Sequence, residues 1–160
     1  MVLSDRLSAM TFSSRTRHVF IVEDAEGRRS FILDAATYSM GRDPTCAIVL
    51  RSDYVSRQHA ILLRVPDPTL GGYRYRILDG NSSGQASTNG LMINGERRST
   101  HDLQERDVMV FSRDTSAVYV TASNLSDAEL MKYCEIVDFR RLKSKTVDPK
   151  QTKVESHFKL

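Results

Sequence analysis

The 160-residue chain contains no tryptophan, only two cysteines and no long apolar run. Cys46 and Cys134 lie too far apart for a CxxC or zinc-binding spacing, so two reduced thiols in a cytoplasmic protein are the simplest interpretation. No segment approaches the roughly 20 apolar residues that span a bilayer. The amino-terminal segment lacks the basic start and apolar stretch of a signal peptide. These absences argue against a disulfide framework, a zinc site and a membrane protein.

Motifs of common enzyme classes are missing as well. The sequence has no GxxxxGK[ST] phosphate loop, no HExxH and no GxSxG elbow. The stretch YVSRQHAILL at 54–63 places Ser56 three residues before His59, which is compatible with half of a hydrolase, a ligand pair or an anion-holding loop. A serine nucleophile needs a third, orienting group and an oxyanion hole, and nothing nearby suggests either. We expect neither enzymatic activity nor a cofactor or metal.

Positive charge is concentrated at one end of the chain. Residues 138–160 contain seven lysines and arginines against three acidic residues, which is a net charge of +4. The whole chain carries +3, so the remainder carries −1. The basic character therefore belongs to a tail and not to the folded body, and the slightly negative charge of that body argues against nucleic-acid binding by it.

Short apolar runs separated by turn residues fill 18–122 and predict an all-β domain. HVFIVE, HAILLRV and AVYVTA have strand composition, and YRYRIL alternates with the period of a half-exposed strand. Asn-Gly in INGE at 93–96 is a strong hairpin signal, and VPDPTLGGY indicates a second hairpin. Many short strands with closely spaced turns predict a sandwich or a barrel.

The two ends differ from this domain. Residues 1–17 are polar and aperiodic, and we expect a flexible arm there. Residues 123–137 predict a helix, in which Ser126 and Glu129 form a capping box. Its apolar face is expected to pack on the end of the β domain, or alternatively on a partner; that face comprises Leu130, Tyr133, Cys134 and Val137. Residues 138–160 are expected to be a solvated basic tail.

Three loops carry groups that suit a phosphate. Gly41-Arg42 ends one predicted strand, Ser56-Arg57 precedes another, and Ser87–Gly90 precedes a third. An arginine fork matches phosphate oxygens bidentately, and hydroxyl and amide groups donate further hydrogen bonds. Glycines beside these groups allow tight turns and close backbone approach. The residues alone therefore predict an anion site made of loops at one end of a sandwich.

The order GR, SRQH, STNG and ING, followed by LQERD, resembles the forkhead-associated (FHA) domain. The resemblance extends over about residues 18–122, roughly two-thirds of the chain. It implies a SMAD/FHA-like β-sandwich of about eleven strands that binds phosphothreonine peptides through loops at one end. With the flanking segments, the expected organisation is a flexible arm, the FHA domain, a C-terminal helix and a flexible basic tail.

The resemblance assigns a role to each loop residue. Arg42 would contact the phosphate and the peptide backbone, Ser56 would bind the phosphate, and Arg57 would add a second polar contact. Thr88 would contact the phosphate or shape a methyl pocket, and Asn89 would hydrogen-bond the peptide backbone. Three further motif positions would be structural: Gly41, Gly90 and His59, the last as a brace that hydrogen-bonds the loops.

The sequence departs from the family pattern in three places. DGNSSGQASTNG is longer than the usual link, and its extra residues 81–86 could change selectivity or mask the site. Leu91 stands where the family often has threonine, which should affect packing only. Tyr54 stands where some members carry a charged residue that reads peptide positions after the phosphothreonine, so an aromatic there suggests an apolar preference.

The resemblance implies an adaptor that docks Thr-phosphorylated partner proteins in Ser/Thr kinase signalling. Two alternatives stay open: an FHA-like scaffold with a weakened phosphate site that binds unphosphorylated proteins, and a polyanion binder that works through the basic tail. Four threonines near the ends, if phosphorylated, could fold back onto the site of the same chain: Thr11, Thr16, Thr146 and Thr152.

Overall fold

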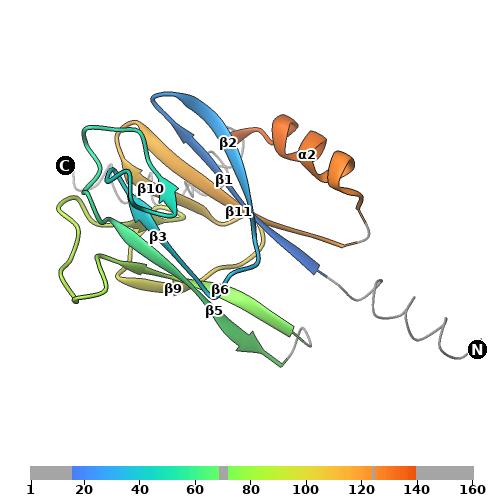
Figure 1. The fold of residues 1–160 in the computed structure, drawn as a ribbon, viewed down its shortest axis with the longest axis horizontal. Helices are drawn as coiled ribbons and strands as arrows, with labels where there is room; N and C mark the ends of the chain where they lie inside the picture. Colours follow the sequence, from blue (N-terminus) through green and yellow to red (C-terminus); the bar gives the residue numbers. More distant parts are fainter. Residues whose placement is uncertain (1–15, 69–71, 124, 140–160) are drawn as a thin grey trace, which may run out of the picture.

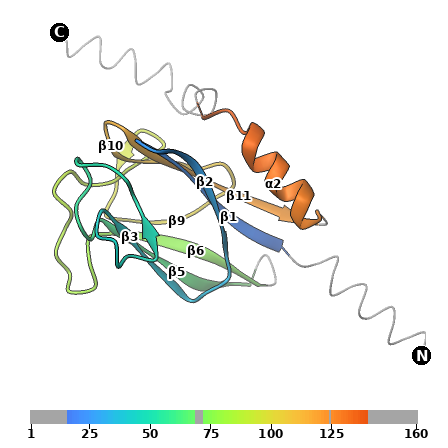
Figure 2. The same cartoon turned by 45° about the horizontal axis from the view of Figure 1, so that its top comes forward.

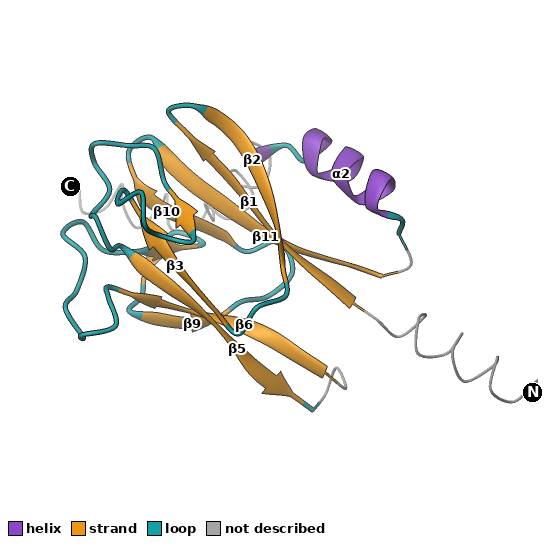
Figure 3. Cartoon of the chain, in the orientation of Figure 1, coloured by secondary structure: helices purple, strands orange, loops and turns teal. Residues whose placement is uncertain are grey.

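The computed structural model describes residues 16–68, 72–123 and 125–139. In these ranges eleven strands form two facing sheets, with a helix on the outside (Figures 1 and 3). The first sheet has the order β2 (Gly27–Leu33), β1 (Thr16–Asp24), β11 (Thr115–Ser123), β10 (Val108–Ser112), β7 (Met92–Ile93) and β8 (Glu96–Arg97). The second has the order β4 (Ile48–Val49), β3 (Thr37–Gly41), β5 (Ala60–Asp67), β6 (Gly72–Asp79) and β9 (Thr100–Asp102). The predicted all-β sandwich is confirmed.

Strand β1 is buried on both faces. Phe20 and Val22 point into the core between the two sheets. Val19 and Ile21 point the other way and belong to a second apolar cluster on the outer face of the six-stranded sheet. Because each face has an apolar neighbour, the sequence of β1 is a continuous apolar run and shows no alternation.

Helix α2 (Asp127–Ile136) covers that outer face (Figure 2). The predicted capping box is present, since the Ser126 hydroxyl accepts from the Glu129 amide and the Glu129 carboxylate accepts from the Ser126 amide. Leu130 and Cys134 are buried in the outer cluster. The helix therefore packs within the chain, but on a sheet face and not on the end of the β domain, because β1, β10 and β11 present valine and isoleucine there. In the described ranges, no helix is long and apolar enough to cross a membrane.

The folded part starts earlier than expected. β1 begins at Thr16, which pairs with Ser123, and Arg17 forms an ion pair with Asp127 at the first turn of α2. The last two residues assigned to the flexible arm therefore belong to the sheet, because β11 extends far enough to pair with them. The remainder of that predicted arm, residues 1–15, lies outside the described residues.

The folded part also ends later than expected. Phe139 is only 3% exposed and packs into the outer cluster. The guanidinium of Arg28, in β2, lies 4.6 Å from the centre of its ring. Phe139 is thus an apolar anchor and not part of a solvated tail. The remaining tail residues, 140–160, lie outside the described residues.

Both predicted hairpins form. β7 and β8 pair across Asn94-Gly95, whose φ angles of 50° and 85° are both left-handed, as a type I′ turn requires. β5 and β6 pair in one continuous register, from Ala60 with Asp79 to Asp67 with Gly72. The tip of this second hairpin, residues 69–71, is outside the described ranges. β6 buries Tyr75 and Ile77 in the alternation predicted for a half-exposed strand.

Candidate functional site

Strand register brings the three predicted loops to one end of the sandwich. Met40, next to the end of β3, pairs with Ala60, the first residue of β5, and Ala60 pairs in turn with Asp79, the last residue of β6. The segments that leave or enter these strand ends are residues 42–47, the Arg42 loop; 50–59, the Ser56 loop; and 80–91, the Asn89 loop. The structure therefore gathers all the predicted site residues at this end.

Gly41 sets how closely the Arg42 loop approaches the Ser56 loop. A Cβ at Gly41 would lie 2.2 Å from the carbonyl oxygen of Arg57 and 2.8 Å from that of Ser56. In this close contact the Arg42 amide donates to the Ser56 carbonyl at 3.0 Å, and the Asp43 amide donates to the Arg57 carbonyl at 3.1 Å. Only glycine leaves room for these two backbone bonds.

His59 links the Ser56 loop to the Asn89 loop. Its Nδ1 accepts from the Ser56 amide at 3.0 Å, and its Nε2 lies 2.8 Å from the Gly90 carbonyl oxygen. Since an amide only donates and a carbonyl only accepts, the ring is neutral with its proton on Nε2. Burial is the main cause that lowers the pKa of His59, and the side chain is 0% exposed. The hydrogen bonds expected of a brace are present.

This arrangement also decides between the interpretations of the Ser56–His59 pair. Both ring nitrogens of His59 are engaged by backbone groups, so the imidazole is not placed to take a proton from the Ser56 hydroxyl. The Ser56 Oγ accepts instead from the Thr88 amide at 2.9 Å, across the two loops. A hydroxyl that accepts in this way keeps its own proton for donation to a ligand.

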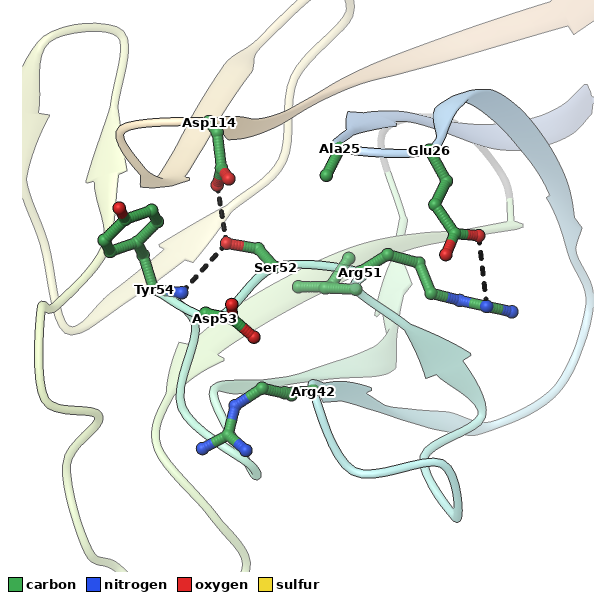
Figure 4. Close-up of a pocket in the computed structure, with 9 residues that line it drawn as sticks. Ala25, Glu26, Arg42, Arg51, Ser52, Asp53, Tyr54 and Asp114 are labelled. Carbon is green, nitrogen blue, oxygen red and sulfur yellow. Dashed lines mark hydrogen bonds and ion pairs between the residues drawn. The ribbon is translucent and has the colours of Figure 1, made fainter.

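Arg42 borders a cavity of about 360 Å³ that lies between the Ser56 loop and the turn that joins β1 to β2. Its Nε donates to the Val55 carbonyl at 3.0 Å, which directs the guanidinium along the Ser56 loop (Figure 4). In the described part of the chain no hydrogen bond of the two terminal nitrogens is found. Arg42 is exposed, and its contact with a ligand stays a prediction.

Arg57 and Asn89 take part in contacts between loops. Arg57 is 71% exposed and pairs with Asp43 at 3.1 Å. Hydrogen bonds from Thr45, and then Arg57, lower the pKa of the Asp43 carboxyl. Asn89 Nδ2 donates to the Tyr54 carbonyl at 2.6 Å, which ties the Asn89 loop to the Ser56 loop.

One supporting network was not predicted from the sequence. The Ser87 hydroxyl donates to an Asp79 carboxylate oxygen at 2.5 Å, and the Ser87 amide donates to the other oxygen at 3.2 Å. The Ser87 hydroxyl also accepts from the Gly90 amide at 2.9 Å. Gly90 has a φ of 78°, which favours glycine. Asp79 thereby shapes the turn that presents Thr88 and Asn89, but in the sequence it looks like an ordinary turn residue at a strand end.

The extra residues of the Asn89 loop, 81–86, hydrogen-bond to one another. The Asn81 side-chain oxygen accepts from the Ser83 and Gln85 amides, both at 2.9 Å, and its nitrogen donates to the Gln85 side chain at 2.8 Å. The residues between Asn81 and Ser87 are exposed. Whether this segment alters selectivity or masks the site stays a prediction. Leu91, in contrast, is fully buried in the core, in line with a packing role.

A second cavity of about 400 Å³ lies on the other side of Tyr54. Its lining includes Asn89, Met92, Val110 and Phe111. The Tyr54 side chain is 48% exposed, and the Arg113 guanidinium lies 4.9 Å from its ring centre. The apolar preference inferred for Tyr54 stays a prediction. The cavity that Tyr54 lines with Met92, Val110 and Phe111 is where an apolar side chain of a peptide would bind under that prediction.

Acidic groups border the first cavity together with its arginines. Glu26, Asp53 and Asp114 line it alongside Arg42 and Arg51 (Figure 4). Arg51 pairs with Glu26 at 3.1 Å. The sequence did not indicate this acidic wall, because its members come from three segments far apart in the chain.

Comparison with known proteins places this geometry in a family. A family model described as "FHA domain" matches residues 38–112. The Slr1951 protein from Synechocystis, whose crystal structure is known, has 40% sequence identity to this chain and a TM-score of 0.61. The match covers 64% of this chain and 96% of Slr1951. The FHA domain of CT664 from Chlamydia trachomatis is 28% identical, with a TM-score of 0.54 and coverage of 65% and 96%.

Two further relatives are longer than this chain. Mycobacterium tuberculosis EmbR, solved in complex with a low-affinity phosphopeptide, is 25% identical with a TM-score of 0.53, over 78% of this chain and 31% of that one. The uncharacterised Synechocystis protein sll1895 is 33% identical over 99 residues, which are 62% of this chain but only 14% of that protein. The sandwich fold, the loop geometry and the matches to Slr1951 and the FHA model together show that the chain belongs to the FHA domain family.

Proposed function

We propose that the chain is a phosphopeptide-binding module that docks Thr-phosphorylated proteins in Ser/Thr kinase signalling. Two observations carry the proposal: the Thr88 amide donates to the Ser56 Oγ, and Arg42 uses only its Nε within the described residues, to the Val55 carbonyl. The first bond leaves the Ser56 proton free to donate, and the second is made to the residue before Ser56.

The chemistry of these groups suits a phosphate. A phosphorylated threonine carries about −1.5 to −2 charges and three acceptor oxygens. Arg42 supplies a charge-assisted pair of donors, Ser56 a hydroxyl donor, and Arg57 a second positive charge at the rim. Thr88 lies beside Ser56, and Asn89 has an amide oxygen available for the backbone of a bound peptide. The phosphopeptide complex of EmbR supports this assignment by similarity.

We further propose that the site prefers phosphothreonine to phosphoserine. A buried methyl group contributes about 0.8 kcal/mol, which corresponds to roughly fourfold in affinity. Aspartate and glutamate should replace the phosphate poorly, because they carry less charge and present a planar pair of acceptors. Both cysteines are free and buried, and we place the module in the cytoplasm, where thiols stay reduced.

The test is a titration of fluorescent peptides from a degenerate phosphothreonine library, each compared with its unphosphorylated twin. The phosphorylated peptide should bind and the twin should not. Arg42→Ala should weaken binding most, by roughly 1.5–3 kcal/mol, or about 10- to 150-fold. Ser56→Ala should cost about 1 kcal/mol. Asn89→Ala should loosen the peptide but keep the preference for phosphate.

Arg98→Ala is the matched control, because Arg98 is an exposed arginine whose side chain pairs with Glu96 and does not line the Arg42 cavity. Its affinity for the phosphopeptide should equal that of the wild type. Equal binding of both peptide forms by the wild type, or unchanged phosphopeptide binding by Arg42→Ala, would show that the proposal is wrong. The first result would favour a phospho-independent scaffold.

A further inference from the structure

The cavity beside Arg42 carries more negative than positive charge. Arg42 and Arg51 line it together with the acidic wall of Glu26, Asp53 and Asp114 (Figure 4). Three carboxylates therefore stand against two guanidinium groups, and the lining has a formal net charge of −1. A ligand that enters this cavity meets an excess of negative charge.

Among the described residues, an arginine neutralises only one of these carboxylates. Glu26 pairs with Arg51 at 3.1 Å, so these two charges offset each other. Asp53 is exposed, and within the described ranges its carboxylate has neither an ion pair nor a hydrogen bond. Its charge is available to a ligand.

Asp114 also keeps its charge in the cavity. Its Oδ1 accepts from the hydroxyls of Ser52 at 2.5 Å, Ser112 at 2.8 Å and Thr115 at 3.0 Å. Burial acts to raise the pKa of this carboxyl, but the hydrogen bonds from the three hydroxyls outweigh burial and lower the pKa. Because the three donors are neutral, they stabilise the charge of Asp114 without cancelling it.

A phosphate bound by Arg42 would make the imbalance larger. It carries about −1.5 to −2 charges, and Arg42 supplies a single positive charge. Asp53 and Asp114 would then lie near an anion while Arg51 is engaged with Glu26. Like charges brought together weaken binding, and this cost is removed when the ligand itself supplies a cation.

We propose that the site selects phosphothreonine peptides with a lysine or arginine near the phosphothreonine, and that this basic side chain binds in the Arg42 cavity beside Asp53. The inference rests on the proposed function and names the class of peptide that the site takes. The cavity of about 360 Å³ corresponds to about a dozen waters at about 30 Å³ each, which leaves room for the side chain of a lysine or an arginine.

The preference belongs to one side of Tyr54. The second cavity, on the other side of this ring, has no carboxylate among its lining residues and includes Met92, Val110 and Arg113. A basic side chain would meet an apolar wall and a like charge there. The partner is therefore expected to be a protein phosphorylated by a Ser/Thr kinase that accepts basic residues on one side of its target threonine.

The experiment titrates one phosphothreonine peptide from the library in forms that carry lysine, alanine or glutamate at each flanking position in turn. At a position on one side of the phosphothreonine, lysine should improve affinity over alanine by about two- to fivefold, as expected for an ion pair at an exposed surface. Glutamate at the same position should bind more weakly than alanine. In about 1 M salt, where the Debye length is about 3 Å, most of the difference should disappear.

Two variants of the chain locate the cation. Asp53→Asn should lower the ratio of the lysine to the alanine affinity toward one and keep the preference for the phosphorylated peptide. Asp127→Asn is the matched control, because it removes the same charge at the first turn of α2, where Asp127 pairs with Arg17 outside this cavity. Its ratio should equal that of the wild type.

The outcomes separate this inference from the proposed function. If the wild type prefers phosphorylated peptides but lysine brings no gain at any position, or if Asp53→Asn keeps the full gain, this inference is overturned and the proposed function stands. If lysine peptides bind equally well with and without the phosphate, the proposed function fails and the inference falls with it.

Discussion

Single residues at this site act mainly through the backbone they hold. Gly41 allows two loops to bond at backbone distance, and His59 uses both ring nitrogens on backbone groups. Neither residue needs to touch a ligand for the geometry of the loops to depend on it. Ser56 illustrates the result, since its amide is held by His59 and its hydroxyl by the Thr88 amide.

Gly41→Ala tests how tightly the loops are packed. The added Cβ would meet the Arg57 carbonyl oxygen, which is backbone and cannot rotate away. Overpacking of this kind typically costs about 1–3 kcal/mol. We expect that loss in the free energy of unfolding, measured in urea, together with weaker phosphopeptide binding. Gly72→Ala is the control, because a Cβ there meets no atom within 4 Å and its stability should be unchanged or slightly higher. Equal stabilities of the two variants would contradict the loop-contact argument.

At the scale of elements, α2 is stabilised at each end by a different part of the chain. The capping box at Ser126 satisfies its first amides locally. Its last turn has no basic residue of its own, and Arg28 from β2 donates to the Cys134 and Glu135 carbonyls instead. A cation at this position also interacts favourably with the helix dipole.

Arg28→Ala should release the C-terminal turn of α2. Hydrogen bonds from a charged donor contribute about 1.5–3 kcal/mol, and the stacking on Phe139 is lost as well. The expected result is a lower free energy of unfolding and faster hydrogen exchange of α2 amides, while the amides of β5 and β6 stay protected. Arg98→Ala removes an exposed arginine and should change stability by no more than about 1 kcal/mol. Unaltered exchange in α2 after the Arg28 change would rule out this role.

At the scale of the whole molecule, two buried histidines at opposite ends of the sandwich couple stability to pH. His59 lies under the loops, and His18 lies near the start of β1, stacked on Tyr73 at 4.8 Å between ring centres. Burial lowers the pKa of His18 from 6.5 to about 4 and lowers the pKa of His59. Both rings are therefore neutral in the folded state under conditions where an unfolded chain already protonates them.

The sign of the pH effect follows from this difference. Below pH 6.5 the unfolded chain binds more protons than the folded chain, because the folded histidines have lower pKa values. Each neutral histidine therefore contributes fully to the free energy of unfolding above that pH. The contribution is lost as the pH falls toward the folded pKa. His18 alone should remove about 2 kcal/mol of stability between pH 7 and pH 5. Urea unfolding at pH 7, 6 and 5 measures this slope. His18→Gln, whose side chain does not titrate, should show a clearly smaller slope, and an identical slope would exclude His18 as its source.

Local signals in the sequence were enough to predict most of the strands and the helix, whereas the binding roles of the loop residues stay predictions. Alternating and continuous apolar runs marked the strands, Asn94-Gly95 marked a hairpin, and Ser126 with Glu129 marked the start of α2. These signals involve residues within a few positions of one another, so they depend little on the rest of the fold. The order of the GR, SRQH and STNG segments likewise identified the three loops that the structure brings together.

The contacts that give the site its shape were decided only by the tertiary structure. The approach of Gly41 to Arg57, the bonds from Arg28 to the end of α2, and the burial of Phe139 join residues that are 16 to more than 100 positions apart. Such contacts depend on strand register and on which sheet face α2 covers, and no short stretch of sequence records either. For the same reason the acidic groups of the cavity became visible only once the β1–β2 turn, the Ser56 loop and the β10–β11 turn lay around it.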